Sequence, residues 1–280
     1  MKNIDSKTTR VLSLNDSSAR LEAVRIIKNG EAVGVFNRGV CAIWGNGRDK
    51  HFYEEVIRIK GEKRGEKPLA TTIRTRDFLE LIDKKKIPRF LHGILLNPEN
   101  LALRIGSLCF IRAPIKAGAA KKLPSYLSSK IDESTYVMQN WDAYGHDSLD
   151  NFMDLLQKEG VDFPSVTSMN FSGETEIVDQ EEGIEFSQKS GIKIFLTDKL
   201  DTGKVKGSFT IISLSEDGLK LIRDGNIPGH VFPYLFEADI NTKDSIPAKF
   251  PQIEFPVDFF IGVSAENARK KILSFITSAI

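Results

Sequence analysis

The chain has 280 residues, of which 41% are hydrophobic and 28% charged, an ordinary composition that can bury a core. The 39 Lys and Arg against 38 Asp and Glu give a formal net charge of +1, which excludes a global field drawing the protein to nucleic acid or membrane. No apolar run reaches the roughly 20 residues of a membrane span. The start is polar, unlike a signal peptide. Cys41 and Cys109 lie in apolar stretches typical of reduced, buried thiols. We therefore expect a cytoplasmic protein without a membrane partner.

The chain begins with a helix followed by two strands. Asp16 or Ser17 is suited to cap the helix, apolar residues then recur along one face, and Gly30 ends it. Short apolar runs at 32–36 and 40–44 are typical of buried strands.

The same alternation continues through the middle of the chain. We expect helices at 49–60, 75–85 (capped by Thr75) and 147–160, and strands at 68–74, 107–115, 191–196, 207–214 and 220–223. Helices and strands that alternate over short connections favour an α/β domain with a twisted, at least partly parallel sheet.

The composition changes from about Phe232, where prolines and aromatic residues punctuate the chain. A final helix follows, with Ser264 as its cap and an apolar stripe that we expect to pack on the main body. We therefore divide the chain into a polar segment 1–15, an α/β domain 16–230 and a C-terminal extension 231–280.

Residues 167–173, TSMNFSG, place three hydroxyls, an amide and a glycine within seven residues. One interpretation is a hydrogen-bonded turn that leaves a strand. The other is a polar cradle for a phosphate or a base, because Ser and Asn donate hydrogen bonds without charge and Gly lets a ligand approach the backbone.

Two further stretches carry groups suited to anions. Residues 58–69, RIKGEKRGEKPL, hold five cations within ten residues, which indicates either a solvated loop after a helix or a clamp on polyphosphate. The hairpin 207–225 carries hydroxyls at Ser208 and Thr210 and ends near Arg223. By itself this hairpin is weak evidence for an anion site.

Together and in this order, these stretches resemble the YrdC-like threonylcarbamoyl-AMP synthase family. Family sequences run from a Lys-x-Arg segment before Pro-Leu, through Ser-Ala-Asn-x-Ser-Gly, to a Ser-Thr-Val strand and an Arg-x-Gly. Here the segments 60–69, 168–173, 208–212 and 222–225 follow that order at compatible spacing. The resemblance covers about residues 16–230, and its specificity rests on the shared order of short motifs.

The resemblance implies a single twisted mixed sheet with flanking helices around a concave cavity. Family members join threonine, bicarbonate and ATP into threonylcarbamoyl-AMP and release pyrophosphate, for the modification of adenosine 37 in transfer RNA. Some members bind double-stranded RNA. The implied cofactors are therefore ATP and the Mg²⁺ that accompanies it. The implied partners are threonine or another small carboxylate with bicarbonate, and transfer RNA or double-stranded RNA.

Site residues carried over by position fall into two groups. The resemblance implies Lys60 and Arg64 as catalytic residues, and the nucleotide-binding residues Lys63, Ser168, Asn170, Ser208, Thr210 and Arg223. No metal ligands are expected, because the four histidines lack metal-ligand spacing.

Two departures from the family affect the amino-acid half of the site. The family reads Pro-Thr-Asp-Thr-Val-Tyr-Gly where this chain reads NRGVCAI at 37–43, and a family arginine aligns with Gln139. Losing a charge partner for a substrate carboxylate typically costs a few kcal/mol. We therefore expect a synthase-like protein with a diverged amino-acid pocket, or alternatively a catalytically decayed module that binds a nucleotide or double-stranded RNA.

Two basic stretches, 83–89 and 115–122, are more typical of solvated faces than of RNA contacts. They would matter for RNA only if they lie in line with the basic loop 60–67. A role as a docking partner through the C-terminal extension has no specific support in the sequence.

Overall fold

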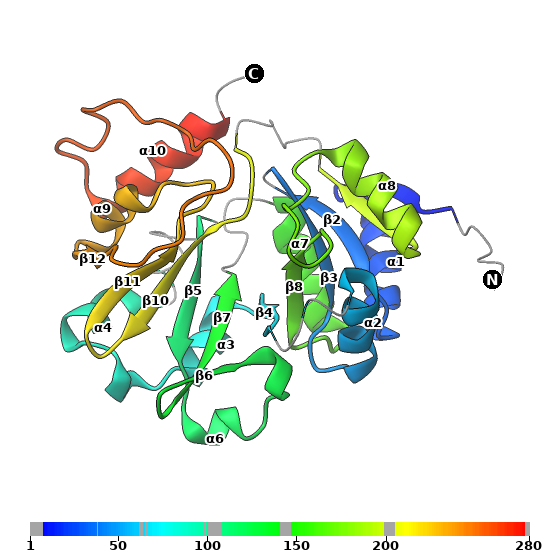
Figure 1. Cartoon of the computed structure of the whole chain (residues 1–280), viewed down its shortest axis with the longest axis horizontal. Helices are drawn as coiled ribbons and strands as arrows, with labels where there is room; N and C mark the ends of the chain where they lie inside the picture. Colours follow the sequence, from blue (N-terminus) through cyan, green and yellow to red (C-terminus); the bar gives the residue numbers. More distant parts are fainter. Residues whose placement is uncertain are drawn as a thin grey trace.

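The computed structural model describes residues 8–37, 39–61, 64, 67–97, 99, 108–140, 147–198 and 205–277. These residues form a mixed sheet flanked by helices (Figure 1). Among them, no helix is long and apolar enough to cross a membrane.

The strands run through the whole described chain. They are β1 (Arg10–Ser13), β2 (Val33–Asn37), β3 (Val40–Asn46), β4 (Ala70–Thr71), β5 (Cys109–Pro114), β6 (Ser129–Ile131), β7 (Ser134–Asn140), β8 (Pro164–Ser168), β9 (Ile194–Thr197), β10 (Thr210–Ser215), β11 (Gly218–Arg223) and β12 (Ile240–Asn241).

Helices lie between many, though not all, of these strands. They are α1 (Ser17–Lys28), α2 (Lys50–Lys60), α3 (Thr75–Leu81), α4 (His92–Leu95), α6 (Ala117–Ala120), α7 (Asp147–Lys158), α8 (Gln180–Ser190), α9 (Phe232–Phe236) and α10 (Ala265–Thr277).

One sheet connects both halves of the chain, in the order β1-β9-β2-β3-β8-β4-β7-β5-β10-β11-β12, with β6 paired to β7. Some neighbours are parallel, such as β2 with β9 and β5 with β10. Others are antiparallel, such as β3 with β8 and β5 with β7. The predicted twisted α/β sheet with flanking helices is thus confirmed, and it is mixed.

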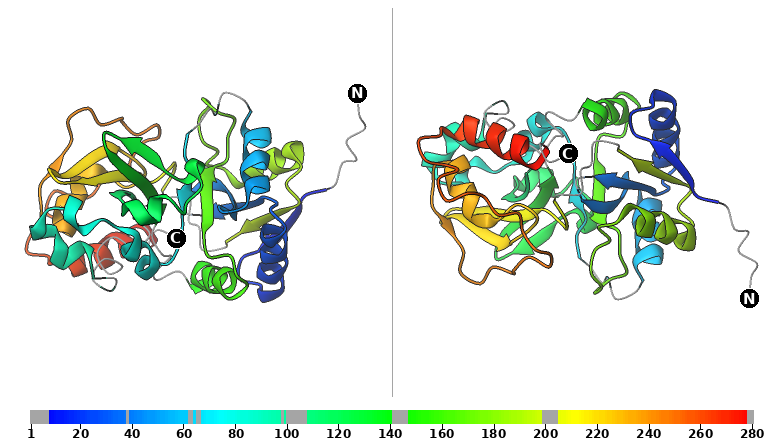
Figure 2. Two further views of the ribbon diagram at one scale, coloured as in Figure 1. Left: turned by 90° about the horizontal axis from the view of Figure 1, so that it is seen from below. Right: turned by 90° about the horizontal axis from the view of Figure 1, so that it is seen from above.

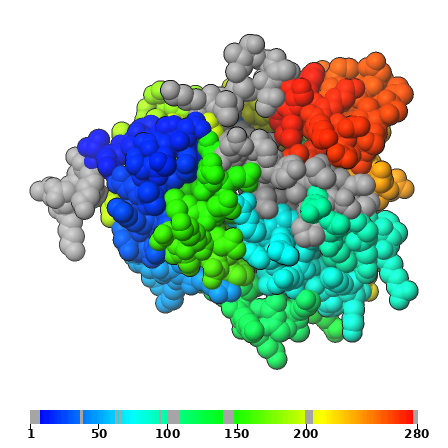
Figure 3. Space-filling model, turned by 180° about the vertical axis from the view of Figure 1, so that it is seen from behind, coloured from blue at the N-terminus to red at the C-terminus, as the bar shows by residue number. Residues whose placement is uncertain are grey.

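Helices cover both faces of the N-terminal half of the sheet (Figure 2). Alternation along the strands sends Val33 and Val35 of β2 toward α1 and α7 in one buried cluster. Cys41 and Ile43 of β3 instead join the larger cluster that contains the apolar face of α2. From behind, α1 and α7 lie side by side on the surface (Figure 3).

Local signals account for several helix ends. Asp16 caps α1, and its carboxylate accepts a hydrogen bond from the amide of Ser18 at 2.8 Å. Gly30 follows the helix with a positive φ of 76°, as expected of a glycine at a helix end. The predicted cap at Thr75 is wrong, because Thr75 is already inside α3 and Arg74 precedes the helix without a side-chain cap bond.

The predicted strand at 68–74 is reduced to the two residues of β4. Several elements had no counterpart in the sequence-based prediction: β1, β6, β7, β12, α4, α6, α8 and α9. β1 pairs in parallel with β9, so residues 10–13 of the polar N-terminal segment belong to the sheet. Both cysteines are buried free thiols, as predicted.

The C-terminal extension packs on the far end of the sheet, opposite α1 and α8 (Figures 1 and 2). Ala268, Ile272 and Ile276 of α10 are buried in the larger cluster. Before α10, residues 240–252 run beside β11. The amide of Asp224 donates to the Ile246 carbonyl at 2.8 Å.

Candidate functional site

A pocket of about 420 Å³ is bounded by the end of α2, the loop after β8 and the β10–β11 hairpin. Its floor consists of side chains from β3, β4, β5, β7 and β8. This volume lies within the range of small-molecule sites.

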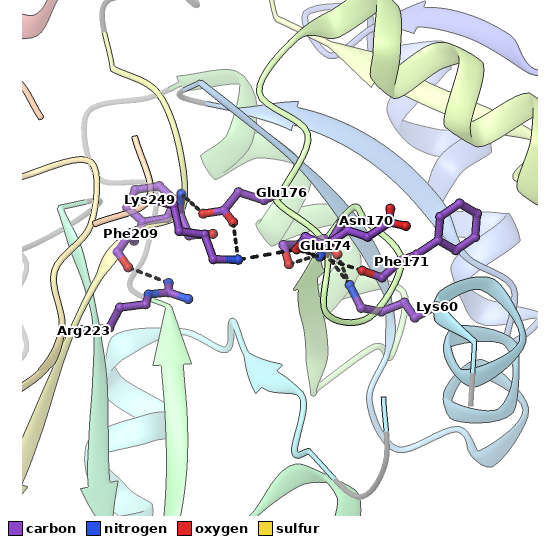
Figure 4. Close-up of polar contacts among 10 residues, drawn as sticks. Lys60, Asn170, Phe171, Glu174, Glu176, Phe209, Arg223 and Lys249 are labelled. Carbon is purple, nitrogen blue, oxygen red and sulfur yellow. Dashed lines mark hydrogen bonds and ion pairs between the residues drawn. The ribbon is translucent and has the colours of Figure 1, made fainter. Parts of the chain in front are cut away.

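The loop after β8 wraps around the last turn of α2. Lys60 Nζ donates to the Ser168 carbonyl oxygen at 2.5 Å and to Asn170 Oδ1 at 2.7 Å (Figure 4). The Ser168 hydroxyl donates to the same Oδ1 at 2.8 Å. The amide of Ser172 donates to the Lys60 carbonyl at 2.9 Å. Two motifs far apart in the sequence therefore form one hydrogen-bonded unit.

The amide nitrogen of Asn170 stabilises the conformation of the loop after β8. Its Nδ2 donates to the carbonyls of Phe171 at 3.0 Å and Glu174 at 2.8 Å. Because both the oxygen and the nitrogen are engaged, Asn170 organises the loop rather than offering free hydrogen bonds. Ser168, Ser172 and the loop backbone still line the pocket. TSMNFSG therefore forms a hydrogen-bonded turn, and the same turn also forms one wall of the pocket.

Burial sets the protonation of Lys60, which is only 5% exposed. Desolvation, aided by the charge of Arg64, lowers the pKa of Lys60 from 10.5 to about 7, although Glu176 acts in the opposite direction. The amine therefore titrates near neutral pH, and a bound anion would return it to the charged form.

Arg64 and Lys67 continue the same side of the pocket. Arg64 is 4% exposed, and its Nη2 donates to the Lys67 carbonyl at 2.8 Å. Its Nε has no hydrogen-bond partner among the described residues, and burial lowers its pKa. A buried guanidinium with a donor to spare is suited to a phosphate or carboxylate ligand. Lys63 lies outside the described residues.

Arg223 reaches the pocket from the opposite side (Figure 4). Its Nη2 donates to the Phe209 carbonyl at 2.8 Å, and burial lowers its pKa. Its Nε is buried without a partner among the described residues. Ser208 lines the same wall. The site therefore has cationic groups on two sides, with space for an anion between them.

Lys249 and Glu176 belong to the site but were not predicted. Lys249, from the C-terminal extension, lines the pocket and lies 3.2 Å from Glu176 Oε2. Glu176 Oε1 accepts the Ser208 amide at 3.1 Å. Burial alone would raise the pKa of Glu176, but backbone hydrogen bonds and the charge of Lys249 lower it. No local signal marks Lys249, because only the path of the extension brings it here.

Two residues discussed from the sequence do not face the pocket. The Thr210 hydroxyl is fully buried and donates to the Ile227 carbonyl, so it is not available to a nucleotide. Gln139 is also buried, and its carboxamide bonds Thr71 and the backbone of Ile73. Met138, one position earlier on β7, lines the pocket instead. Strand alternation places neighbouring residues on opposite faces, which explains both outcomes.

Among the described lining residues, the cations are Lys60, Arg64, Lys67, Arg223 and Lys249. The lining also holds one carboxylate, that of Glu174, and the nearby carboxylate of Glu176 is engaged by Lys249 and an amide. The balance of charge around the pocket is therefore positive, which favours an anionic ligand such as a polyphosphate.

No protein-family model and no curated protein matches the sequence. Solved structures do match. P. abyssi Sua5 complexed with L-threonine is 18% identical with a TM-score of 0.61, covering 96% of this chain and 76% of that one. The chain spans 66% of a second Sua5 structure. E. coli YciO is 13% identical with a TM-score of 0.54, covering 78% of this chain and 96% of its own. The chain therefore has the YrdC-like fold, as the sequence predicted.

Proposed function

We propose that the chain is an ATP-dependent synthase that activates a small carboxylate or carbamate as its adenylate. In this proposal it resembles threonylcarbamoyl-AMP synthases, acts in the modification of adenosine 37 of transfer RNA, and has a diverged amino-acid pocket. One observation carries the proposal: segments that are distant in the sequence meet in one pocket, where they supply the groups Lys60, Arg64, Ser168, Ser208 and Arg223.

In the proposed reaction, an oxygen of the carboxylate or carbamate attacks the α-phosphorus of ATP. The new P–O bond forms as the bond to the bridging β-phosphate oxygen breaks, and pyrophosphate leaves with that electron pair. No proton has to be removed from the attacking carboxylate. Lys60 and Arg64 on one side and Arg223 on the other would hold the phosphates and stabilise the charge that develops on them.

Mg²⁺ is expected to arrive with the nucleotide. Within the described ranges, no cluster of three or more His, Cys, Asp or Glu side chains could hold a metal ion. In nucleotide sites Mg²⁺ is bound largely by phosphates and water.

The Sua5 neighbour supports a threonine-like second substrate, because its structure contains L-threonine. The chain departs from that family at 37–43, where Val40 and Ala42 line the pocket. We therefore propose bicarbonate with threonine or another small carboxylate as the substrates. Where the substrate has an amine, its nitrogen bonds to the bicarbonate carbon as water leaves, and this gives the carbamate that attacks ATP.

An ATP–pyrophosphate exchange assay with bicarbonate and a panel of amino acids tests the proposal. We expect exchange in the wild type and a loss of about a hundredfold in Lys60→Met, comparable to removing one charge-stabilising donor. Lys158→Met, a change at an exposed site on α7, is the matched control. Exchange that survives Lys60→Met, or absence of ATP binding by the wild type, would contradict the proposal.

A nucleic-acid-binding role is the second candidate, and one arrangement favours it. The amide of Lys116 donates to the Leu81 carbonyl at 2.9 Å, so the two basic stretches lie side by side. Tyr126, just beyond them, stacks on Tyr53 of α2 with ring centroids 4.2 Å apart. The basic stretches are thereby joined to the helix that carries Lys60.

We define the basic strip by its exposed lysines, which are Lys84, Lys85, Lys116, Lys121 and Lys122. RNA that binds these lysines would release the counterions condensed on its phosphates. We therefore expect the affinity for a short RNA duplex to fall with salt, and a Lys121→Gln/Lys122→Gln variant to reduce the slope of log K against log salt by about 1 to 2. Filter binding measures both, with Lys158→Gln as control. Binding that is insensitive to salt would exclude this role.

A further inference from the structure

The C-terminal extension supplies one of the cations that line the pocket, Lys249. Its Nζ lies 3.2 Å from Glu176 Oε2 and donates to the Glu174 carbonyl at 3.4 Å. In Figure 4 its side chain lies between Arg223 and Lys60. The extension therefore places an amine between the two cationic sides of the pocket.

The segment that carries Lys249 is hydrogen-bonded to the end of the β10–β11 hairpin on both sides of this residue. Before it, the Ile246 carbonyl accepts the amide of Asp224 at 2.8 Å. After it, Gln252 Nε2 donates to Asp224 Oδ1 at 2.9 Å and to the Gly225 carbonyl at 2.8 Å. The amine thus reaches the pocket only while the extension is docked on the hairpin.

The ion pair with Glu176 leaves Lys249 able to bind a ligand. A lysine ammonium has three donors. The Glu176 carboxylate also accepts the Ser208 amide at 3.1 Å, so it keeps a hydrogen-bond partner if Lys249 moves. The side chain of Lys249 is 49% exposed, against 8% for Glu176. A new contact from Lys249 to an anion in the pocket therefore requires little further desolvation.

Lys60, the other amine in Figure 4, is held more tightly. It is 5% exposed and donates to the Ser168 carbonyl and to Asn170 Oδ1. Burial lowers the pKa of Lys60 to about 7, so that part of the population is neutral at neutral pH. Lys249 is not buried in this way, and its contact with the loop after β8 is longer.

From this arrangement, and resting on the proposed function, we propose that Lys249 is a phosphate-binding residue that the C-terminal extension supplies to the pocket. Glu176 holds the side chain over the pocket, and the polyphosphate of the ligand accepts a hydrogen bond from its amine. Because the same segment is bonded to the hairpin, binding of the anion also stabilises the docked extension. This coupling is reciprocal, so displacement of the extension weakens phosphate binding by the same factor.

Titration calorimetry on the full chain with inorganic triphosphate tests the assignment. We expect Lys249→Met to weaken binding by about tenfold or more, as for loss of a hydrogen bond to a charged group. Lys249→Arg should restore most of the affinity. Lys243→Met, at an exposed position of the same extension, is the matched control for the loss of one charge. Equal affinities in the two methionine variants, or no binding by the wild type, would overturn the proposal.

Hydrogen exchange of the Asp224 and Ile246 amides, which bond the extension to the hairpin, measures the coupling. We expect triphosphate to slow this exchange by about fivefold or more in the wild type and by less than about twofold in Lys249→Met. Equal slowing in both proteins, or in neither, would refute the coupling. Failure of the proposed function alone has a different signature: triphosphate binding that depends on Lys249, without pyrophosphate exchange for any amino acid.

Discussion

The buried amine of Lys60 predicts an unusual dependence of stability on pH. Its folded pKa is about 7, against 10.5 for the free side chain, because burial disfavours the charge. Between these two values the unfolded chain binds more protons than the folded one. Stability therefore rises with pH in this window, by up to about 1.4 kcal/mol per pH unit. From pH 7 to pH 9 the gain amounts to about 2 kcal/mol.

The perturbation is Lys60→Met, which removes the titrating amine and keeps most of the chain length. The variant loses two hydrogen bonds to Ser168 and Asn170, a cost that does not depend on pH in this range. The wild type, by contrast, loses its desolvation penalty as the pH rises. The difference in unfolding free energy, wild type minus variant, should therefore grow by about 2 kcal/mol from pH 7 to pH 9.

Urea unfolding curves at pH 7, 8 and 9 measure this difference, with both proteins free of ligand. Lys158→Met serves as the control, because that lysine is exposed on α7. A wild-type-minus-variant difference that stays constant within about 0.5 kcal/mol across the three pH values would refute the reasoning about burial.

Three further predictions concern the loop, the carboxylate and the core. Asn170→Ala removes the acceptor for Lys60 and both donors to the loop carbonyls, and should cost about 2–3 kcal/mol by urea unfolding and weaken ATP binding. The lowered pKa of Glu176 stabilises the fold above pH 4.5 and loses that effect as the pH falls through the folded pKa; Glu176→Gln should flatten this acid-side loss in thermal melts. Gly45→Ala would place a methyl group 2.1 Å from the Phe52 ring and should destabilise by about 1–3 kcal/mol, with Gly118→Ala, which meets nothing within 4 Å, as the control.

The order of helices and strands could be predicted because its signals are local. Asp16 caps α1 through an amide two residues away, and Ser264 precedes α10 as the sequence indicated. The strands β2, β3, β5, β9 and β10 each coincide with a predicted apolar run, whereas no apolar run predicted the central strand β7. The elements that were missed are weakly patterned: α8 has an Asp179 cap and a Gly191 end, but little apolar periodicity between them.

The site could be predicted only as a set of segments. Lys60, Arg64, Ser168, Asn170, Ser208 and Arg223 were all selected from short motifs, and the structure brings them to one pocket or its immediate support. Thr210 was selected with them and lies outside the pocket. A sequence motif does not show on which face of a strand a hydroxyl lies, because a register shift of one residue moves every side chain to the opposite face.

Sequence by itself thus determined most of the longer helices, several core strands and the residue types available for an anion. Tertiary structure alone decided which side chains share the pocket. Lys249 is the clearest case, because an extension that runs beside β11 places it next to Glu176, which lies 73 positions earlier in the chain. The apolar surface formed by Trp44, Val166 and Ala70 is another, because it exists only where β3, β8 and β4 lie in register. The physical reason is that local backbone preferences act over a few residues, whereas a site depends on strand order and register set by burial of the whole core.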